Sequence, residues 1–321
     1  MPPIYSLNKL AIILGHPRKR LEEIAARSAL LYQPFLRKRP GKKPRPIDNP
    51  VSPLKEIQQR IYRRILRHAV LPEFFHGGVS GKSAETNARI HIAQKTVVTV
   101  DVEGCFPSIT DEMVFKVWRE HFGFSRDVAG LLARLTTFRH HLPQGASTSL
   151  SLANLVMLPA LLQVRNRAQK SNLLFGQFVD DSGLSGRTID DGLITEISSA
   201  LKGVELRISR DKIRVMRAGE PHIITGLTTN TKLGIPKKKR SDIRAAVFQL
   251  ERQSPSARVF AKSFQSAAGR VKRMSRYHPT KGHQLMERLR RLGRRAGLKD
   301  MTRKTPPAAP KEVRETGALP S

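Results

Sequence analysis

The sequence predicts an α+β fold in which amphipathic helices pack against a sheet, and three observations carry this prediction. Residues 96–100 (Thr-Val-Val-Thr-Val) are β-branched throughout, which is typical of a buried strand. Residues 178–183 (Phe-Val-Asp-Asp-Ser-Gly) join an apolar end to a turn signal, which indicates a hairpin. Long stretches before and after these strands carry apolar residues at helical spacing.

Length and charge limit the classes of function. The 321 residues can form two or three compact units with a sizeable core. Lys and Arg total 58 against 26 Asp and Glu, which gives a formal net charge of +32. This excess indicates a polyanionic partner, and nucleic acid is favoured because each neutralised phosphate releases counterions. An anionic membrane surface is the rival, but no apolar run reaches the roughly 18–20 residues that span a bilayer.

The single cysteine, Cys105, excludes an intrachain disulfide and is compatible with a reducing cytosol. Its apolar setting favours a small packed thiol over a nucleophile. The first residues, Met1-Pro2-Pro3-Ile4, lack a basic region ahead of an apolar core, so no signal peptide is expected. We therefore expect a cytoplasmic location.

The N-terminal part begins with two predicted helical pieces in residues 6–31, separated at Gly15-His16-Pro17, with Ser6 as a cap. Residues 37–50 are cationic and rich in Pro and Gly, which suits either a solvated basic loop or a hairpin. Residues 54–70 place isoleucines on one stripe and predict an amphipathic helix.

Residues 76–83 end in Gly-Lys-Ser, as a phosphate-binding loop does. That loop needs a glycine where this chain has His76, and no apolar strand leads into it, so a nucleotide-hydrolase site is excluded. Asn87 and His91 follow at a four-residue spacing, which would place both on one face of a helix.

The remaining elements are predicted from periodicity and turn residues. Helices are expected at 111–122, 128–137 and 151–162, a strand-turn-strand at 204–216, and a short strand at 223–227. Residues 241–300 repeat amphipathic segments dense in Arg and Lys, which indicates a basic helical bundle. The proline-rich tail from Thr305 is expected to be disordered.

Three carboxylates are the candidate site. Asp101 ends the strand at 96–100, and Asp180 and Asp181 stand on the later hairpin. An Asp-Asp pair beside glycine is also common in solvated turns, so the pair alone indicates little. Together the three suit two-metal phosphoryl transfer, because Mg²⁺ takes carboxylate and phosphate oxygens. Asp101 and Asp180 would bridge the ions, with Asp181 nearby.

The ordered motifs resemble those of reverse transcriptases. The matching segments are Val100-Asp101 with Phe106, Gln144 to Ser149, and Phe178-Val179-Asp180-Asp181. Two further segments are similar to the Asn-Ala-x-x-His and Val-Thr-Gly elements of bacterial retron reverse transcriptases: residues 87–91 and 224–226. The resemblance covers roughly residues 30–250 and implies a right-hand polymerase with fingers, a ferredoxin-like antiparallel palm and a helical thumb.

The resemblance also implies a division of the chain. N-terminal helices would occupy residues 1–30, fingers interleaved with palm 31–95, and palm 96–230 with a fingers insertion at about 111–142. A helical thumb would follow at 231–304, before the tail at 305–321.

The family's residue roles carry over to matching positions. Asp101, Asp180 and Asp181 would be catalytic and would bind two Mg²⁺ ions, with Mn²⁺ as an alternative. Asn87 and His91 would belong to an RNA-facing or structural helix, and Thr225 and Gly226 would contact RNA.

Five residues would bind the incoming nucleotide by resemblance. Arg45 would hold the triphosphate, because one guanidinium group can bind two phosphate oxygens at once. Lys38 and Lys43 are further candidates for this contact. Gln144 and Gly145 would position the nucleotide. Phe106 would exclude a ribose 2′-hydroxyl, unless it is only a core phenylalanine. Lys212 would protonate the leaving pyrophosphate.

The sequence departs from the family pattern at two positions. Leu150 stands where proline is usual, and Phe178 replaces the tyrosine of Tyr-x-Asp-Asp. The first change would alter a helix start, and the second removes one hydroxyl while leaving both carboxylates.

The implied reaction is RNA-templated DNA synthesis from deoxynucleoside triphosphates. A structured non-coding RNA would be template and 2′-hydroxyl primer, giving RNA-linked single-stranded DNA, and the implied role is antiphage defence with a separate effector protein. A diversity-generating or group II intron-derived reverse transcriptase is one alternative, disfavoured by residues 87–91 and 224–226. The other is a catalytically weak RNA-binding scaffold, which Leu150 and Phe178 leave open.

Overall fold

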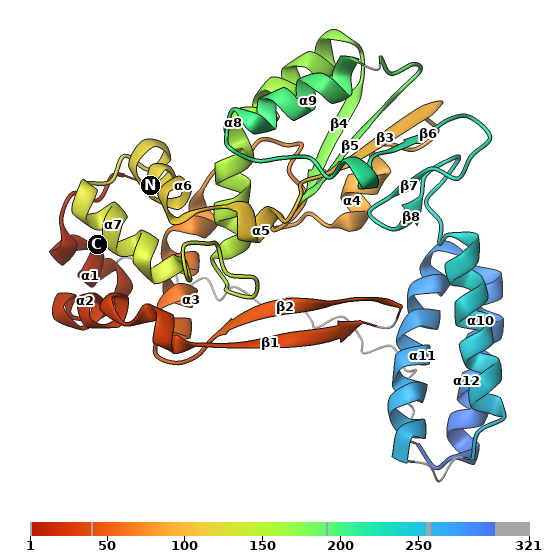
Figure 1. Cartoon of the computed structure of the whole chain (residues 1–321). Helices are drawn as coiled ribbons and strands as arrows, with labels where there is room; N and C mark the ends of the chain where they lie inside the picture. The colour runs from red at the N-terminus through yellow and green to blue at the C-terminus, as the bar shows by residue number, and fades with distance from the viewer. Residues whose placement is uncertain (1, 40, 191, 255–257, 299–321) are drawn as a thin grey trace, which may run out of the picture. The chain divides into compact units, whose positions relative to one another are not determined.

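The computed structural model describes residues 2–39, 41–190, 192–254 and 258–298 (Figure 1). The chain divides into two compact units, Met1–Leu233 and Gly234–Ser321. The first unit contains every described strand and one continuous hydrophobic core. The second unit is helical in its described part and has a core of its own.

The centre of the first unit is a four-stranded sheet in which all neighbours are antiparallel. Its strands are β3 (Thr96–Asp101), β4 (Leu174–Phe178), β5 (Asp181–Gly186) and β6 (Arg214–Met216), in the order β4-β5-β3-β6. The valines of β3 are buried, as the β-branched run predicts. The predicted α+β class with an antiparallel sheet is therefore confirmed.

Two separate hairpins extend the first unit. The long one joins β1 (Tyr32–Arg39) to β2 (Lys42–Pro50), so the basic stretch at 37–50 forms a hairpin rather than an irregular loop. The short one joins β7 (Ile223–Ile224) to β8 (Leu227–Thr228). Residues 223–227 were expected as a single strand, and that prediction is wrong. Thr225 and Gly226 turn the chain with φ of 46° and 78°.

Helices cover the sheet and build the rest of this core (Figure 1). They are α1 (Leu7–Leu14), α2 (Arg18–Ala26), α3 (Leu54–Arg64), α4 (Ala84–Arg89), α5 (Cys105–Ser108), α6 (Asp111–Lys116), α7 (Arg126–Thr136), α8 (Ser149–Lys170) and α9 (Gly192–Lys202). The predicted cap is confirmed, because the backbone N–H of Lys9 donates to Ser6 Oγ at 3.2 Å. Both α4 and α8 contact strand β4.

Two predicted elements differ from the structure, and one helix was not predicted. Residues 204–208 form no strand beyond a bridge between Ile208 and Val102, and a 3₁₀ turn at Arg210–Lys212 precedes β6. Helix α8 continues well past the predicted end at residue 162, because Arg167, Lys170 and other polar residues extend it beyond its apolar centre. Helix α9 was not predicted, although Leu193, Ile197 and Leu201 are its buried face.

The second unit consists of α10 (Lys237–Glu251), α11 (Arg258–Tyr277) and α12 (Pro279–Arg295) in its described part. Phe260, Phe264 and Leu289 are buried at its centre. Arg288 donates to both carboxylate oxygens of Glu251, at 2.8 and 2.6 Å, which joins α12 to α10. The predicted basic helical bundle is confirmed, and the predicted disordered tail lies outside the described residues.

Membrane crossing requires a helix that is both long and apolar. None of the helices in the described ranges combines the length and the apolar composition that crossing a bilayer requires.

Candidate active site

Three aspartates meet at one end of the central sheet. Asp101 is the last residue of β3 and pairs in register with Asp181, the first residue of β5. Strands β4 and β5 are joined by Val179 and Asp180, because Phe178 pairs with Asp181 across the hairpin. Val179 has φ of 61°, an uncommon backbone conformation for a β-branched residue. This tight turn holds Asp180 and Asp181 beside Asp101.

A lysine from another segment reaches the same carboxylates. Lys212 Nζ lies 2.6 Å from Asp101 Oδ1. The segment that carries it is attached to β3, because the backbone N–H of Ser209 donates to the carbonyl of Asp101 at 2.8 Å. The predicted site residue Lys212 therefore stands next to the predicted aspartates.

The carboxylates repel one another. Loss of surrounding water, followed by the charges of Asp180 and Asp101, raises the pKa of Asp181 to about 6. Burial also raises the pKa of Asp180, with a further contribution from Asp101. Carboxylates whose pKa is raised by burial and by like charges are typical of functional sites.

The donor chemistry of the three aspartates fits a divalent ion, because Mg²⁺ and Mn²⁺ prefer carboxylate oxygens. In the described part of the chain, no three His, Cys, Asp or Glu groups already converge as a set of metal ligands. The ammonium group of Lys212 lies against Asp101, so an ion that takes this oxygen would have to displace it. The residues present therefore fit the group by the chemistry of their donor atoms.

A cleft of about 410 Å³ opens beside the carboxylates, between the sheet and the β7–β8 hairpin. Its lining includes Asp101, Asp181 and Lys212, and also Asn87, Thr225 and Gly226. Thr225 Oγ1 donates to the carbonyl of Ala84 at 2.7 Å, which fixes the hairpin turn to the start of α4. The segments at 87–91 and 224–226 are thus neighbours of the site.

Asn87 and His91 are almost completely buried, with exposed fractions of 1% and 0%. They lie against Gly176 and Gly183, which face each other across β4 and β5. A methyl group on Gly176 would stand 2.5 Å from Asn87 Oδ1, so both glycines make room for these side chains. Burial lowers the pKa of His91 to about 4. Of the two roles predicted for this pair, their burial favours the structural one.

The long hairpin is connected to the turn that contains Gln144 and Gly145. Arg45 Nε donates to Gln144 Oε1 at 2.8 Å. Asp48 accepts from the backbone N–H of Gln144 at 2.9 Å and lies 3.2 Å from His141 Nε2. The structure therefore brings the predicted residues Arg45, Gln144 and Gly145 together. Asp48 was missed, because nothing in its sequence neighbourhood shows that β2 pairs with a loop almost 100 residues later.

Phe106 lies on α5, five residues after Asp101, and is 8% exposed. The neighbouring Cys105 is buried, and its pKa is raised to about 12 by loss of water and by the charges of Asp180 and Asp101. An inert, packed thiol agrees with the role predicted for it.

Hydrogen bonds from residues that the sequence did not indicate stabilise the turn that carries Asp180 and the loop packed against it. Gln177 Nε2 donates to the carbonyl of Val179 at 2.9 Å, and Ser182 Oγ donates to Gln177 Oε1 at 2.5 Å. Asn154 of α8 donates to the carbonyl of Gly77 at 2.8 Å. A methyl group on Gly77 would stand 2.4 Å from the backbone N of Val179. The turn is therefore in direct contact with the loop before α4.

The two departures from the family pattern have structural neighbours. Leu150, near the start of α8, fills the space beside Gly78, where an added methyl would stand 2.5 Å from Leu150 Cγ. Phe178 precedes the turn and lines the same cleft as Asp101 and Asp181. Neither residue separates the carboxylates.

Comparison with known proteins gives a consistent result. The model of the family "Reverse transcriptase (RNA-dependent DNA polymerase)" matches residues 36–256. The retron Se72 reverse transcriptase of Salmonella heidelberg (strain 579083-10) is 28% identical over 289 residues, covering 85% of this chain and 76% of that protein. The retron Ec86 reverse transcriptase of Escherichia coli is 28% identical over 217 residues, covering 67% of this chain and 68% of that one.

A solved structure of telomerase from Candida albicans, in complex with a fragment of telomeric RNA, is also similar to this chain. The sequence identity is 13% and the TM-score is 0.46, with 84% of this chain and 59% of the telomerase chain covered.

Proposed function

This chain belongs to the reverse transcriptase family and is an RNA-directed DNA polymerase, and we propose that it copies the dedicated RNA of a retron. The observation that supports polymerase chemistry is the meeting of Asp101, Asp180, Asp181 and Lys212 at one end of the sheet. The retron Se72 and Ec86 reverse transcriptases support the choice of a retron.

The proposed reaction is attack by a priming hydroxyl on the α-phosphate of a deoxynucleoside triphosphate. Asp101, Asp180 and Asp181 would hold two Mg²⁺ ions, for which Mn²⁺ could substitute. Such ions, when bound, lower the pKa of the priming hydroxyl and stabilise charge on the leaving pyrophosphate. Lys212, which donates to Asp101, would move from that carboxylate and protonate the leaving group.

The residues around the carboxylates would select and orient the nucleotide. Arg45 would bind the triphosphate, and its bond to Gln144 would connect that contact to the turn that positions the base. Phe106 would stand against the sugar and exclude a 2′-hydroxyl. Asn87 and His91 would act on RNA only indirectly, through the cleft that they support beside Thr225 and Gly226.

Each part of the chain would have its own role in this reaction. The β1–β2 hairpin would belong to the fingers, the central sheet would be the palm, and α10–α12 would be the thumb. The partner would be a structured non-coding RNA that supplies both template and primer, and a separate effector protein would complete an antiphage system. The RNA–DNA product would remain bound through backbone charge.

The experiment that tests the site uses purified protein, a primed RNA template and labelled deoxynucleotides. We expect the Asp180→Asn, Asp181→Asn double variant to lose incorporation by at least about 10³-fold while keeping RNA affinity. The matched control is Asp190→Asn, an exposed aspartate in the loop after β5. Synthesis by the double variant at the wild-type rate would overturn the assignment of these carboxylates.

A second experiment tests the retron assignment. The chain is expressed with its native flanking DNA, and total nucleic acid is examined for a short DNA that changes in size after RNase treatment. Its appearance, and its loss in the double variant, would support RNA-linked DNA. Copying of a supplied RNA without any such product would indicate a reverse transcriptase of another lineage, and no copying at all would favour a scaffold.

A further inference from the structure

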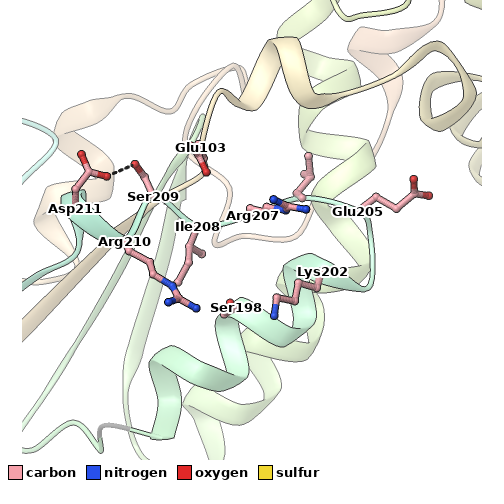
Figure 2. Close-up of a pocket in the computed structure, with 10 residues that line it drawn as sticks. Glu103, Ser198, Lys202, Glu205, Arg207, Ile208, Ser209, Arg210 and Asp211 are labelled. Atoms are coloured by element: carbon pink, nitrogen blue, oxygen red, sulfur yellow. Dashed lines mark hydrogen bonds between the residues drawn. The ribbon is translucent and has the colours of Figure 1, made fainter.

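A cavity of about 840 Å³ lies outside the carboxylate site, between α9 and the segment at 206–211 (Figure 2). Three basic side chains line it: Lys202, Arg207 and Arg210. Figure 2 shows the charged ends of Lys202 and Arg210 pointing toward the same space beside Ser198. The cavity is therefore a concave surface with a cluster of positive charge.

In the described part of the chain, these three cations differ from their neighbours in having no ion pair with a carboxylate. Lys116 lies 3.6 Å from Glu205, and Arg167 lies 2.9 Å from Glu196. Among the residues that the structure describes, no hydrogen bond or ion pair reaches the charged end of Lys202, Arg207 or Arg210. Like charges gathered in one cavity repel one another, and a bound anion would relieve that repulsion.

The carboxylates that line the cavity do not supply this counter-charge. Asp211 accepts a hydrogen bond from Ser209 Oγ at 2.8 Å, and Glu205 is engaged by Lys116. Figure 2 shows the carboxylates of Asp211 and Glu205 on opposite flanks, turned away from Lys202 and Arg210. Glu103 is the third carboxylate of the lining, so three acidic and three basic side chains share the cavity, with Lys202 and Arg210 pointing away from Asp211 and Glu205 (Figure 2).

The cavity is directly connected to the strand end that carries Asp101. The backbone N–H of Glu103 donates to the carbonyl of Arg207, and that of Ser209 donates to the carbonyl of Asp101, both at 2.8 Å. Lys212, two residues after Arg210, donates to Asp101. The short segment at 207–212 would therefore contact both an anion in the cavity and the reaction site at Asp101.

We infer that this cavity is a binding site for a small oligophosphate, outside the carboxylate site and held by Lys202, Arg207 and Arg210. Guanidinium and ammonium groups without other partners bind phosphate oxygens strongly. The source of the ligand rests on the proposed function: it is the pyrophosphate released at each addition, or the triphosphate of a waiting nucleotide. A nucleic acid strand is disfavoured, because it would have to pass the carboxylates of Glu205 and Asp211 on the two flanks of the cavity.

The test is calorimetric titration of the full chain with inorganic pyrophosphate in EDTA, so that no metal ion bridges phosphate to the aspartates. We expect the Lys202→Ala, Arg207→Ala, Arg210→Ala triple variant to bind pyrophosphate at least about 10-fold more weakly than wild type. The matched control is Lys95→Ala, which removes an exposed cation elsewhere in the same unit and should change nothing. Thermal unfolding checks that the variants fold, and Arg210→Gln alone should give a smaller loss in the same direction.

Further titrations identify the source. Loss of deoxynucleoside triphosphate binding in parallel with pyrophosphate indicates the triphosphate of a waiting nucleotide, whereas loss confined to pyrophosphate indicates the released product. Unchanged pyrophosphate binding by the triple variant overturns the inference, as does a loss seen only with single-stranded DNA. Because the titration needs no DNA synthesis, it reports on this cavity even if the proposed function fails.

Discussion

Lys212 contacts the candidate catalytic carboxylates directly, since its ammonium group donates to Asp101 at 2.6 Å. We predict that Lys212→Ala lowers the single-turnover rate of nucleotide addition by about 10²-fold, because loss of a positioned proton donor typically costs about 10²–10⁴-fold. Lys212→Arg should restore little of it, since guanidinium does not release its proton. Equal rates for Lys212→Ala and the Lys95→Ala control would contradict the assigned role.

Asp181 should make stability depend on pH when divalent ions are removed. Its pKa in the folded chain is raised to about 6, above the unfolded value of about 3.9. The folded state therefore holds the proton more tightly, and the resulting stabilisation is complete below about pH 4 and lost as pH rises through about 6.

We predict from this sign that Asp181→Asn raises the melting temperature in EDTA at pH 8 and has a much smaller effect at pH 4. The gain should not exceed about 1 kcal/mol, since solvent screens a carboxylate at the edge of a cleft. Thermal melts of both proteins at the two pH values provide the measurement. A difference that does not change with pH would show that folding does not raise the pKa of Asp181.

At the level of elements, the Asp180 turn depends on its contact with the loop at 74–77. Gly77→Ala would place a methyl group 2.4 Å from the backbone N of Val179. The turn would have to shift to relieve this clash, which would move Asp180 away from Asp101 and Asp181. We therefore predict at least about a 10-fold loss of kcat. Gly130→Ala is the control, since the nearest atom to an added methyl in α7 is 4.0 Å away. Equal activity of both variants would mean that the turn adapts freely.

The β1–β2 hairpin and the Gln144 turn should act as one element. Asp48 accepts from the N–H of Gln144 and lies beside His141. We predict that Asp48→Ala raises the KM for deoxynucleotides by about 10-fold with a smaller change in kcat, since a charge-assisted hydrogen bond contributes about 1.5–3 kcal/mol. Asp48→Asn keeps one oxygen acceptor, so its KM in steady-state assays should lie between those of the wild type and Asp48→Ala. A fall in kcat alone would argue against this positioning role.

Local sequence signals predicted the elements whose own residues determine them. The β-branched run at 96–100 formed a strand because its valines are buried on both sides, and the turn at Gly15 ended α1 as expected. Residues 204–208 could not be placed in this way, since Leu206 is buried without pairing in a sheet. Asn154 supports the loop against the Asp180 turn only because the fold brings α8 to Gly77, and no spacing within α8 indicates that contact.

The charge of the whole molecule should make its nucleic-acid affinity steeply dependent on salt. With a formal net charge of +32, contacts to phosphate are expected to dominate binding of an RNA–DNA duplex. We predict that Lys237→Ala, Lys238→Ala, Arg244→Ala on α10 reduces the slope of log affinity against log salt by up to about 0.9 for each phosphate that the variant no longer neutralises. Filter binding over a salt series measures the slope. An unchanged slope would show that α10 does not lie along the duplex.

The buried thiol of Cys105 gives the molecule a practical property. It is the one cysteine of the sequence, and its pKa of about 12 leaves almost no thiolate at neutral pH. Maleimide reagents should therefore not react with the folded wild-type chain. A cysteine introduced in place of an exposed residue, such as Lys38 of β1 or Phe248 of α10, would then carry a single fluorophore at a chosen position without prior removal of any native thiol.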